Sequence, residues 1–410
     1  MTDVSTARPG QQTTRRSARG PARSKQIIRA AANLFHEAGF QNVSIDDIGS
    51  AVGLTGPAVY RHFKGKNDIL AKALLSQVTI VEDIAVRAAE RSGTAQERMV
   101  AFLDELGERA VSTDEPMLWR SERRHLEPTD AADFRAMFGR VLELTVKLLE
   151  DVRQDLAGGR AELLGFALLS MYAYTHDIRV GLAPARLQQV QRAIAHSIVH
   201  CDLPAPGPDA EPAPQMTEWM PAGRRERLIH ASTGLFDERG FHDVRIDDIA
   251  KAAGMSVATL YQHFKGKNEL LQAILERGAE GLLYTSAAAL ARVSSPAEAL
   301  DVLVRTYTKG ALGMHGRIMR ILATELVYLS DEVRTQLRTV QREYVAEWIQ
   351  AMCALRPELS SSDARALAHA TIDVVTDLSQ TRRVRSRPGI ADELHALAMS
   401  MVLPTELGAD

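Results

Sequence analysis

Two clusters of side chains with phosphate-binding chemistry lie in this 410-residue chain. Each cluster places a phenol, an imidazole and two ammonium groups within seven residues. The first consists of Tyr60, His62, Lys64 and Lys66, and the second, 201 residues later, of Tyr261, His263, Lys265 and Lys267. Such groups donate hydrogen bonds to phosphate oxygens, which holds a protein on a nucleic-acid backbone. The repetition favours this role over packing of the tyrosines in a core and plain surface positions for the histidines.

The first cluster lies near the end of a longer segment, and the sequence of this segment predicts how the cluster is positioned. Residues 39–70 align without a gap with residues 240–271, and 17 of 32 positions are identical. Ser44 is expected to cap a short helix, and Gly53 to allow a tight turn after it. Thr55 then caps a second helix over residues 56–63, in which Pro57 is tolerated in the first turn. Two short helices joined in this way predict a helix-turn-helix, whose second helix enters a DNA major groove.

The second copy predicts the same arrangement with one weaker point. Gly254 and Ser256 supply the turn and the cap before a helix over residues 257–264. Arg245 stands where the first copy has the capping Ser44, so a weaker start is expected for the preceding helix.

The run I-D-D-I…G…Y-x-H-F-x-x-K, present twice, resembles the DNA-binding head of the TetR family of one-component bacterial regulators. The resemblance implies three helices in each head and about six in a following body, the last two forming a four-helix interface. It assigns base-edge contacts to Thr55, Gly56, Pro57 and Ala58 in the first head, and to Ser256, Val257, Ala258 and Thr259 in the second. It assigns phosphate contacts to Tyr60, His62, Lys66, Tyr261, His263 and Lys267, with Lys64, Lys265 and Ser44 as further candidates for contact with DNA.

The charge of the chain is concentrated where the motifs lie. The net charge is −3, yet residues 11–67 carry nine Arg/Lys against three Asp/Glu, a net charge of +6. Residues 222–268 carry eight against six, a net charge of +2. Basic ends on an acidic body suit a protein that meets phosphate through two small regions.

Several classes of protein find no support in the sequence. Two cysteines without metal-ligand spacing indicate a reducing cytoplasm, and the longest apolar run, residues 163–175, is too short to span a bilayer. No phosphate loop, serine-nucleophile motif or paired carboxylates point to an enzyme, a cofactor or a metal. The scattered histidines His196, His200 and His315 are interpreted as ordinary structural or surface residues.

The predicted fold is all-α and consists of two similar halves arranged as a single-chain pseudo-dimer. The bodies also match, at an offset of 203 residues, as Glu122 and Glu325 show. Residues 161–200 and 364–403 are expected to pack on each other as the four-helix interface. The expected parts are a disordered basic arm at 1–20, heads at 21–70 and 223–271, bodies at 71–200 and 272–404, and a stiff Pro-rich linker at 201–222.

A basic and aromatic cluster in the first body is the candidate ligand site. Its members are Trp119, Arg120, Arg123, Arg124 and His125. One interpretation is a solvated or salt-bridged face. The other is recognition of an anionic head group, as in acyl-CoA, because the cluster resembles a segment of TetR-type regulators of lipid and steroid catabolism. The second body has Leu326, Val327 and Tyr328 in place of the last three members, so only the first body would bind an anion.

These features predict a nucleoid-associated transcriptional regulator that binds double-stranded DNA at an imperfect palindrome. The copies differ at the reading positions, so one chain is expected to read two unlike half-sites. By the logic of the family, it is a repressor released by a small apolar or CoA-linked lipid-like effector. Two alternatives stay open, a homodimer with four heads and a ligand sensor or scaffold whose second head no longer binds DNA.

Overall fold

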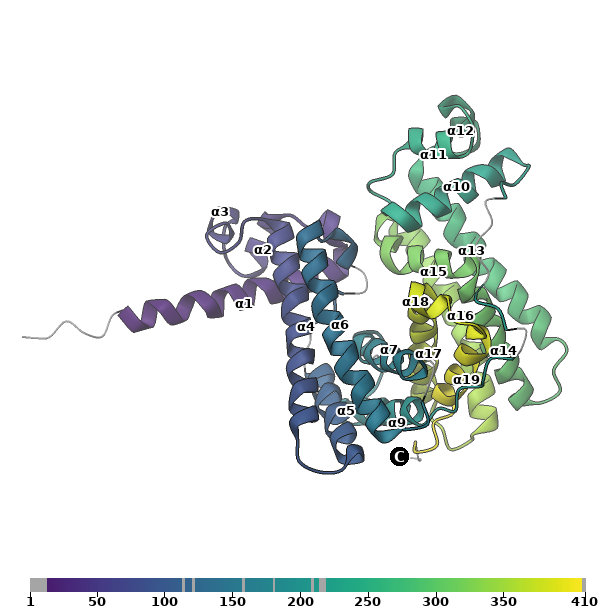
Figure 1. Ribbon diagram of the computed structural model, residues 1–410. Coiled ribbons are helices and arrows are strands. Elements are labelled where there is room, and N and C mark those ends of the chain that lie inside the picture. The colour runs from purple at the N-terminus through teal and green to yellow at the C-terminus, as the bar shows by residue number, and fades with distance from the viewer. Residues whose placement is uncertain are drawn as a thin grey trace, which may run out of the picture. The chain divides into compact units, whose positions relative to one another are not determined.

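The computed structural model describes residues 13–112, 115–119, 122–156, 159–179, 181–207, 210–213 and 219–407, without the side chains of residues 13–21 or of residues 176 and 177. Its described elements are all helices (Figure 1). They form two compact units, one of residues 1–79 and 115–137, the other of residues 80–114 and 138–410. None of the described helices is long and apolar enough to cross a membrane.

The first head lies in the first unit. It comprises α1 (Thr13–Ala38), the 3-10 turn η1 (Phe40–Asn42), α2 (Ile45–Ala51), α3 (Gly56–Val59) and the start of α4 (Lys66–Glu90). Gly39 ends α1 with a φ of 78°, a value that a residue with a Cβ rarely adopts. The helix begins at Thr13, so residues 13–20 belong to α1 rather than to the disordered arm that was expected, and residues 1–12 lie outside the described part.

The second head has the same order of elements. It comprises α10 (Arg224–Arg239), α11 (Ile246–Ala252), α12 (Val257–His263) and the start of α13 (Lys267–Leu290). Its core is built from Leu228, Phe236, Ile249, Leu260 and Phe264, all fully or nearly fully buried. The core continues without a break into the second body.

The described elements of the two bodies are all helices, joined by turns and loops. The first contains the rest of α4, then α5 (Ala95–Ser112), η2 (Arg123–His125), α6 (Pro128–Val152), α7 (Arg160–Ala173), α8 (Thr175–Ile178) and α9 (Pro184–Val199). The second contains the rest of α13, then α14 (Pro296–Leu312), α15 (Met314–Glu325), η3 (Leu326–Tyr328), α16 (Asp331–Leu355), α17 (Ser361–Gln380), α18 (Arg382–Arg385) and α19 (Ile390–Val402). The second body therefore has a helix, α15, with no counterpart among the described residues of the first body.

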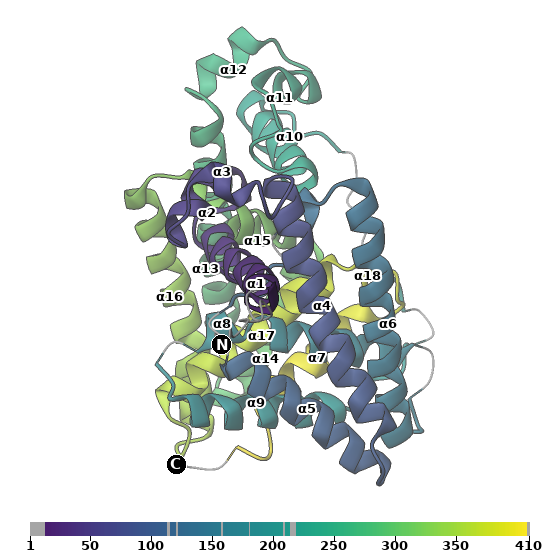
Figure 2. The ribbon, with the colours of Figure 1, turned by 90° about the vertical axis from the view of Figure 1, so that its left-hand side faces the viewer.

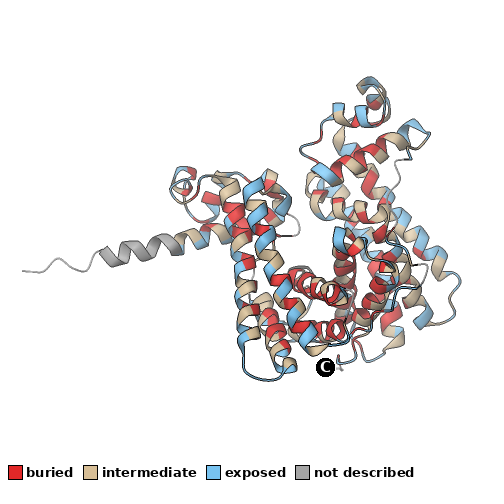
Figure 3. Ribbon diagram, viewed as in Figure 1, coloured by how far each residue is buried: buried red, intermediate tan, exposed pale blue. Residues whose placement is uncertain are grey.

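The bodies meet through their last long helices, as the sequence predicted. Helix α7 packs against α17, and α9 packs against α19, all within one chain (Figures 1 and 2). Eleven of the fourteen residues of α7 are buried, so the helix is covered on nearly every side (Figure 3). A helix that is apolar all round is stable only inside a core, and here the second half of the chain completes that core.

The linker runs along this shared core instead of standing free. The Pro204 carbonyl accepts a hydrogen bond from Arg160, and the Ala213 N–H donates to the Arg385 carbonyl at 3.0 Å. The Glu211 carbonyl accepts from the N–H of Gly389. The described parts of the linker are thus bonded to both halves, whereas residues 208–209 and 214–218 lie outside the description.

One buried ion pair fastens α9 to the start of α17. Arg186 donates from Nε to Oδ1 of Asp363 at 3.0 Å and from Nη2 to Oδ2 at 2.8 Å. Asp363 is almost fully buried, and Ser360 donates a further hydrogen bond to its carboxylate. Burial raises the pKa of Asp363, but the bonds from Arg186 and Ser360 outweigh it and hold the pKa below its usual value.

Replacing Arg186 by Met should lower the free energy of unfolding by about 3 kcal/mol, because a buried carboxylate loses its partner. The control is Arg192→Met on the same helix. Arg192 pairs with Asp104 at an exposed site, so this substitution should lower the free energy of unfolding by less than about 1 kcal/mol. Urea unfolding followed by circular dichroism measures both. Equal losses would show that the Arg186 pair adds nothing to the interface.

Candidate nucleic-acid interface and effector cavity

The turn between the two short helices is the same in both heads. Gly53 has a φ of 67° and Gly254 a φ of 66°, the left-handed region expected for both residues. The N–H of Leu54 donates to the Gly49 carbonyl at 2.8 Å, and the N–H of Met255 donates to the Ala250 carbonyl at 2.8 Å. Each head therefore contains a complete helix-turn-helix.

The first short helix starts differently in the two copies. Ser44 caps α2 as predicted, because its Oγ accepts from the N–H of Asp47 while the Asp47 carboxylate accepts from the N–H of Ser44. The Ser44 hydroxyl also donates to the Asp47 carboxylate, and this bond, together with the one from the Ser44 N–H, lowers the pKa of Asp47. In the second head, Arg245 supplies no side-chain cap, yet Asp248 still accepts from its N–H at 3.0 Å. Half of the reciprocal arrangement survives, so the start of α11 is weaker without being lost.

The groove-entering helix is shorter in the first head than the sequence predicted. It ends at Val59 instead of Phe63, whereas α12 runs from Val257 to His263. Thr55 occupies the N-cap position, but its side chain accepts no hydrogen bond from the helix. Ser256 does cap α12, accepting from the N–H of Thr259 at 3.1 Å. The missing cap and the poor helix former Gly56 account for the shorter helix.

Many of the predicted DNA contacts are exposed on each head. In the first head the exposed members are Ser44, Thr55, Pro57, Tyr60 and Lys64, and in the second they are Ser256, Ala258, Tyr261 and Lys265. The two tyrosines are 58% and 55% exposed, which is unusual for so large a side chain and excludes core packing. Ala58, His62, Val257, Thr259 and His263 are half-buried, and Gly56 is buried. The imidazole of His62 lies 3.3 Å from the hydroxyl of Ser24 on α1.

Lys66 and Lys267 serve the heads themselves, whatever they do on DNA. The Nζ of Lys66 donates to the carbonyls of Phe40, at 2.8 Å, and of Gln41, and lies 4.4 Å from the centre of the Phe40 ring. Lys267 repeats these contacts with Phe241 and its neighbour. Burial lowers the pKa of both ammonium groups, and nearby carboxylates oppose it. An ammonium has three donors, so one remains for phosphate.

The cluster predicted to bind an anion joins the body to the head. The ring of His125 stacks on Phe40 with centroids 5.0 Å apart. Trp119 is buried, Arg123 and Arg124 are exposed, and Arg120 lies outside the described residues. In the second half, Tyr328 stacks on Phe241 in the same way, with centroids 5.2 Å apart. These contacts favour the structural interpretation, and recognition of an anion by the two exposed arginines stays a prediction.

A cavity lies in the second body, where the sequence had given no ligand site. It holds about 540 Å³, counting its mouth, between α13, α14, α15, α16 and α17. None of its fifteen lining residues is charged at neutral pH. They are Leu275, Gly278, Ala279, Leu282, Tyr307, His315, Ile318, Met319, Leu322, Leu337, Val340, Gln341, Tyr344, Val345 and Ile372. At the positions of Gly278 and Leu322, the first half has the bulkier Gln77 and Trp119. A comparison of the two copies in the sequence therefore contains a signal for this cavity.

The polar groups of the cavity wall are few and neutral. The hydroxyl of Tyr307 is 2.6 Å from the Thr376 hydroxyl, and the His315 ring meets the Tyr307 ring edge to face. The buried Nε2 of His315 has no hydrogen-bond partner among the described residues. Burial lowers the pKa of His315 to about 4, so the imidazole is neutral at pH 7 and can give or accept one hydrogen bond. His315, interpreted from the sequence as ordinary, is therefore a cavity residue.

Two complete helix-turn-helix motifs that expose tyrosine, lysine and hydroxyl side chains define a DNA-binding protein of the helix-turn-helix class. The family model described as bacterial regulatory proteins, tetR family, matches residues 27–73 and again residues 228–274. An uncharacterized HTH-type transcriptional regulator of Mycobacterium tuberculosis is 30% identical over 199 residues, which cover 42% of this chain and 98% of that protein. The chain therefore belongs to the tetR family of bacterial regulatory proteins, as a tandem form with two family heads.

Other similar proteins cover single stretches of the chain. The HTH-type transcriptional repressor KstR2 of Mycolicibacterium smegmatis is 30% identical over 115 residues, which cover 28% of this chain and 56% of that protein. The solved structure of the ketosteroid transcriptional regulator KstR2 of Mycobacterium tuberculosis is 21% identical, with a TM-score of 0.40. It covers 45% of this chain and 95% of that one.

Stability should fall as the pH drops from about 6.5 to about 4, because the unfolded imidazole of His315 takes up a proton that the folded one refuses. Over that window, His315→Leu should reduce the slope of the unfolding free energy against pH by about 1 kcal/mol per pH unit. Urea unfolding at several pH values measures the slope, with His230→Leu on α10 as the control. An unchanged slope for His315→Leu would mean that the ring titrates freely in the folded protein.

Proposed function

We propose that this chain is a transcriptional repressor that occupies one operator with its own two heads. The observation that carries the proposal is the pairing of α7 and α9 with α17 and α19 inside one chain. In symmetric regulators, a second copy supplies the second head through an isologous interface. Here the second half of the same chain takes that place, so a partner copy has no need to supply it.

The two heads are suited to unlike half-sites. Pro57 and Ala58 offer DNA small apolar contacts, such as with a thymine methyl, where the second head presents Ala258 and Thr259. The two groove-entering helices also differ in length and capping. An operator read by both heads would therefore be an imperfect palindrome.

The alternative in which the second head has lost DNA binding finds little support. Its turn matches that of the first head, its groove-entering helix is longer and capped, and Tyr261 is as exposed as Tyr60. A four-headed homodimer would need a further interface, because the helices that dimerise in the implied family fold are already paired. Repression, rather than activation, is proposed by the logic of the family, since the similar proteins include both a named repressor and a named activator.

The cavity of the second body supports a neutral, mainly apolar effector with one hydrogen-bonding group placed near His315. Its walls are apolar, and none of its lining residues carries a charge that would compensate a phosphate or carboxylate. Burying an unpaired charge is costly, so a CoA head group is excluded from the interior of the cavity. The sequence predicted either a small apolar effector or a CoA-linked one, and this cavity favours the apolar effector.

One chain should fill one operator, and each head should protect its own half-site. Sedimentation of the protein with DNA from its own promoter region measures the stoichiometry, and hydroxyl-radical footprinting measures the protection. Lys64→Ala and Lys265→Ala should each weaken protection of a different half-site about fivefold, because each removes a phosphate contact. Arg292→Ala, exposed at the end of α13, is the control. Two chains on each operator, or loss of both half-sites together, would contradict the single-chain arrangement.

The neutral probe N-phenyl-1-naphthylamine should bind at least about tenfold more tightly than its anionic analogue 8-anilinonaphthalene-1-sulfonate, because the cavity offers no charge partner. Fluorescence titration measures both affinities. Leu322→Trp, which copies Trp119 of the first half, should abolish binding of the neutral probe. Tighter binding of the anionic probe, lost in the double variant Arg123→Ala and Arg124→Ala, would instead support the anion site in the first body.

A further inference from the structure

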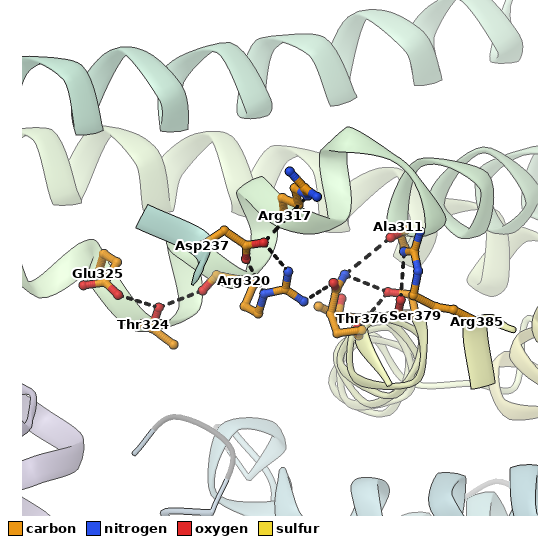
Figure 4. Close-up of polar contacts among 10 residues, drawn as sticks. Asp237, Ala311, Arg317, Arg320, Thr324, Glu325, Thr376, Ser379 and Arg385 are labelled. Carbon is orange, nitrogen blue, oxygen red and sulfur yellow. Dashed lines mark hydrogen bonds and ion pairs between the residues drawn. The ribbon is translucent and has the colours of Figure 1, made fainter. Parts of the chain in front are cut away.

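Helix α15 touches both the effector cavity and the second head. Its residues Ile318 and Leu322 line the cavity. On another face, Arg320 donates from Nε and Nη2 to the two carboxylate oxygens of Asp237 on α10, the first helix of the head (Figure 4). Arg317 lies 3.7 Å from the same carboxylate, which is almost fully buried. A displacement of α15 by a ligand would therefore act directly on α10.

The same arginine also binds α17, the helix that packs against α7 of the first body. The Nη1 of Arg320 donates to the side-chain oxygen of Gln380 on α17, and Gln380 donates in turn to the Ala311 carbonyl of α14 and to the hydroxyl of Ser379. The planar guanidinium makes contacts on both sides at once, which a lysine could not do. We call Arg320 with Asp237 and Gln380 the Arg320 bridge (Figure 4).

The charge around the bridge makes it sensitive to displacement. Arg385 on α18 donates to the Ser379 carbonyl at 3.1 Å and lies near Arg317 and Arg320. Burial lowers the pKa of Arg385, and the two other guanidinium groups lower it further, while Asp237 raises it. Removing the Asp237 carboxylate from this group would leave several positive charges facing one another.

Among its described residues, the first half has no helix in the place of α15, and it lacks the two charged residues of the ion pair. His36 stands where α10 has Asp237, and Met117 where α15 has Arg320. The segment equivalent to α15 is held by the buried side chain of Gln77, which donates to the Pro116 carbonyl at 2.8 Å and accepts from the N–H of Leu118 at 3.0 Å. In the second half, Gly278 replaces Gln77, and Ile318 packs over it so closely that any added Cβ would displace it.

We propose that an effector in the cavity regulates the second head alone, through α15 and the Arg320 bridge, while the first head stays bound to its half-site. This inference rests on the proposed function, since it assigns the regulation of the same cavity. A ligand shifts such an equilibrium only by binding one position of α15 better than the other. The chain would then be released from one half-site first, not from both together.

The test moves α15 without any effector. Gly278→Ala places a methyl group against Ile318, and α15 has to give way. Footprinting of the full chain on its operator should show at least about tenfold weaker binding at the half-site of the second head and less than about twofold change at the other. Val340→Phe, which fills the cavity from α16, should act in the same direction. Protection by the first head shows in the same experiment that each variant is folded.

Arg320→Met, which copies the first half, should uncouple the cavity from the head. In that background Gly278→Ala should change binding at the second half-site less than about twofold, whatever Arg320→Met does alone. Arg305→Met, which removes a surface ion pair on α14, is the control and should leave the effect of Gly278→Ala intact. A merely structural role for Arg320 would instead make the two losses multiply.

Two results would overturn the inference. One is equal loss at both half-sites in Gly278→Ala, and the other is multiplied losses in the double variant. Neither depends on a ligand, so they are distinct from a failure of the neutral probe to bind. That failure would remove the effector from the proposed function and leave the coupling through α15 standing.

Discussion

Burial of α7 on nearly every side requires the second half of the chain. The helix is apolar almost all round, so its own body can cover only part of it, and α17 covers the rest. The buried pair of Arg186 and Asp363 then fixes how α9 meets the start of α17. Because the two bodies share this core, they fold as one structure, and the linker that joins them is bonded along its surface. The tandem arrangement is therefore a condition of stability and not only a duplication of heads.

Within this shared framework, a few substitutions make the halves unequal. In the first half the side chain of Gln77 bonds to the main chain of Pro116, whereas Gly278 at the same place in the second half lies directly against Ile318 of the helix α15. Helix α15 places Arg320 against the head, and another face of the same helix lines the apolar cavity. The junction nearer the DNA stays alike, since His125 and Tyr328 stack on equivalent phenylalanines. A duplicated regulator can thus keep two similar heads while its two bodies diverge, the second one around a cavity.

The predicted DNA contacts show how far residue types carry an argument. Exposure of Tyr60 and Tyr261 could be anticipated, because the same polar cluster occurs twice. A tyrosine that packs in a core is not expected to recur with lysines beside it. The role of Lys66 and Lys267 could not be anticipated, because their bonds to main-chain carbonyls depend on how the turn after the first helix of each head folds back. The basic cluster at residues 119–125 had two interpretations from its composition, a salt-bridged face and an anion site. His125 packs on Phe40 of the head, which supports a structural role for that residue, and recognition of an anion by Arg123 and Arg124 stays a prediction.

The sequence by itself determined the all-α fold, the two heads, their turns and the pairing of the last helices of each body. The all-α fold, the heads and their turns follow from local signals, namely turn glycines, capping side chains and apolar periodicity, and from the repeat. The pairing of the last helices follows from the resemblance to the TetR family. Only the tertiary structure decided which body holds a cavity, because a cavity is the space left between five helices and has no residue of its own. The structure also decided that Asp237 and Arg320, 83 residues apart in the chain, form one ion pair, since that contact depends on the docking of a head on a body.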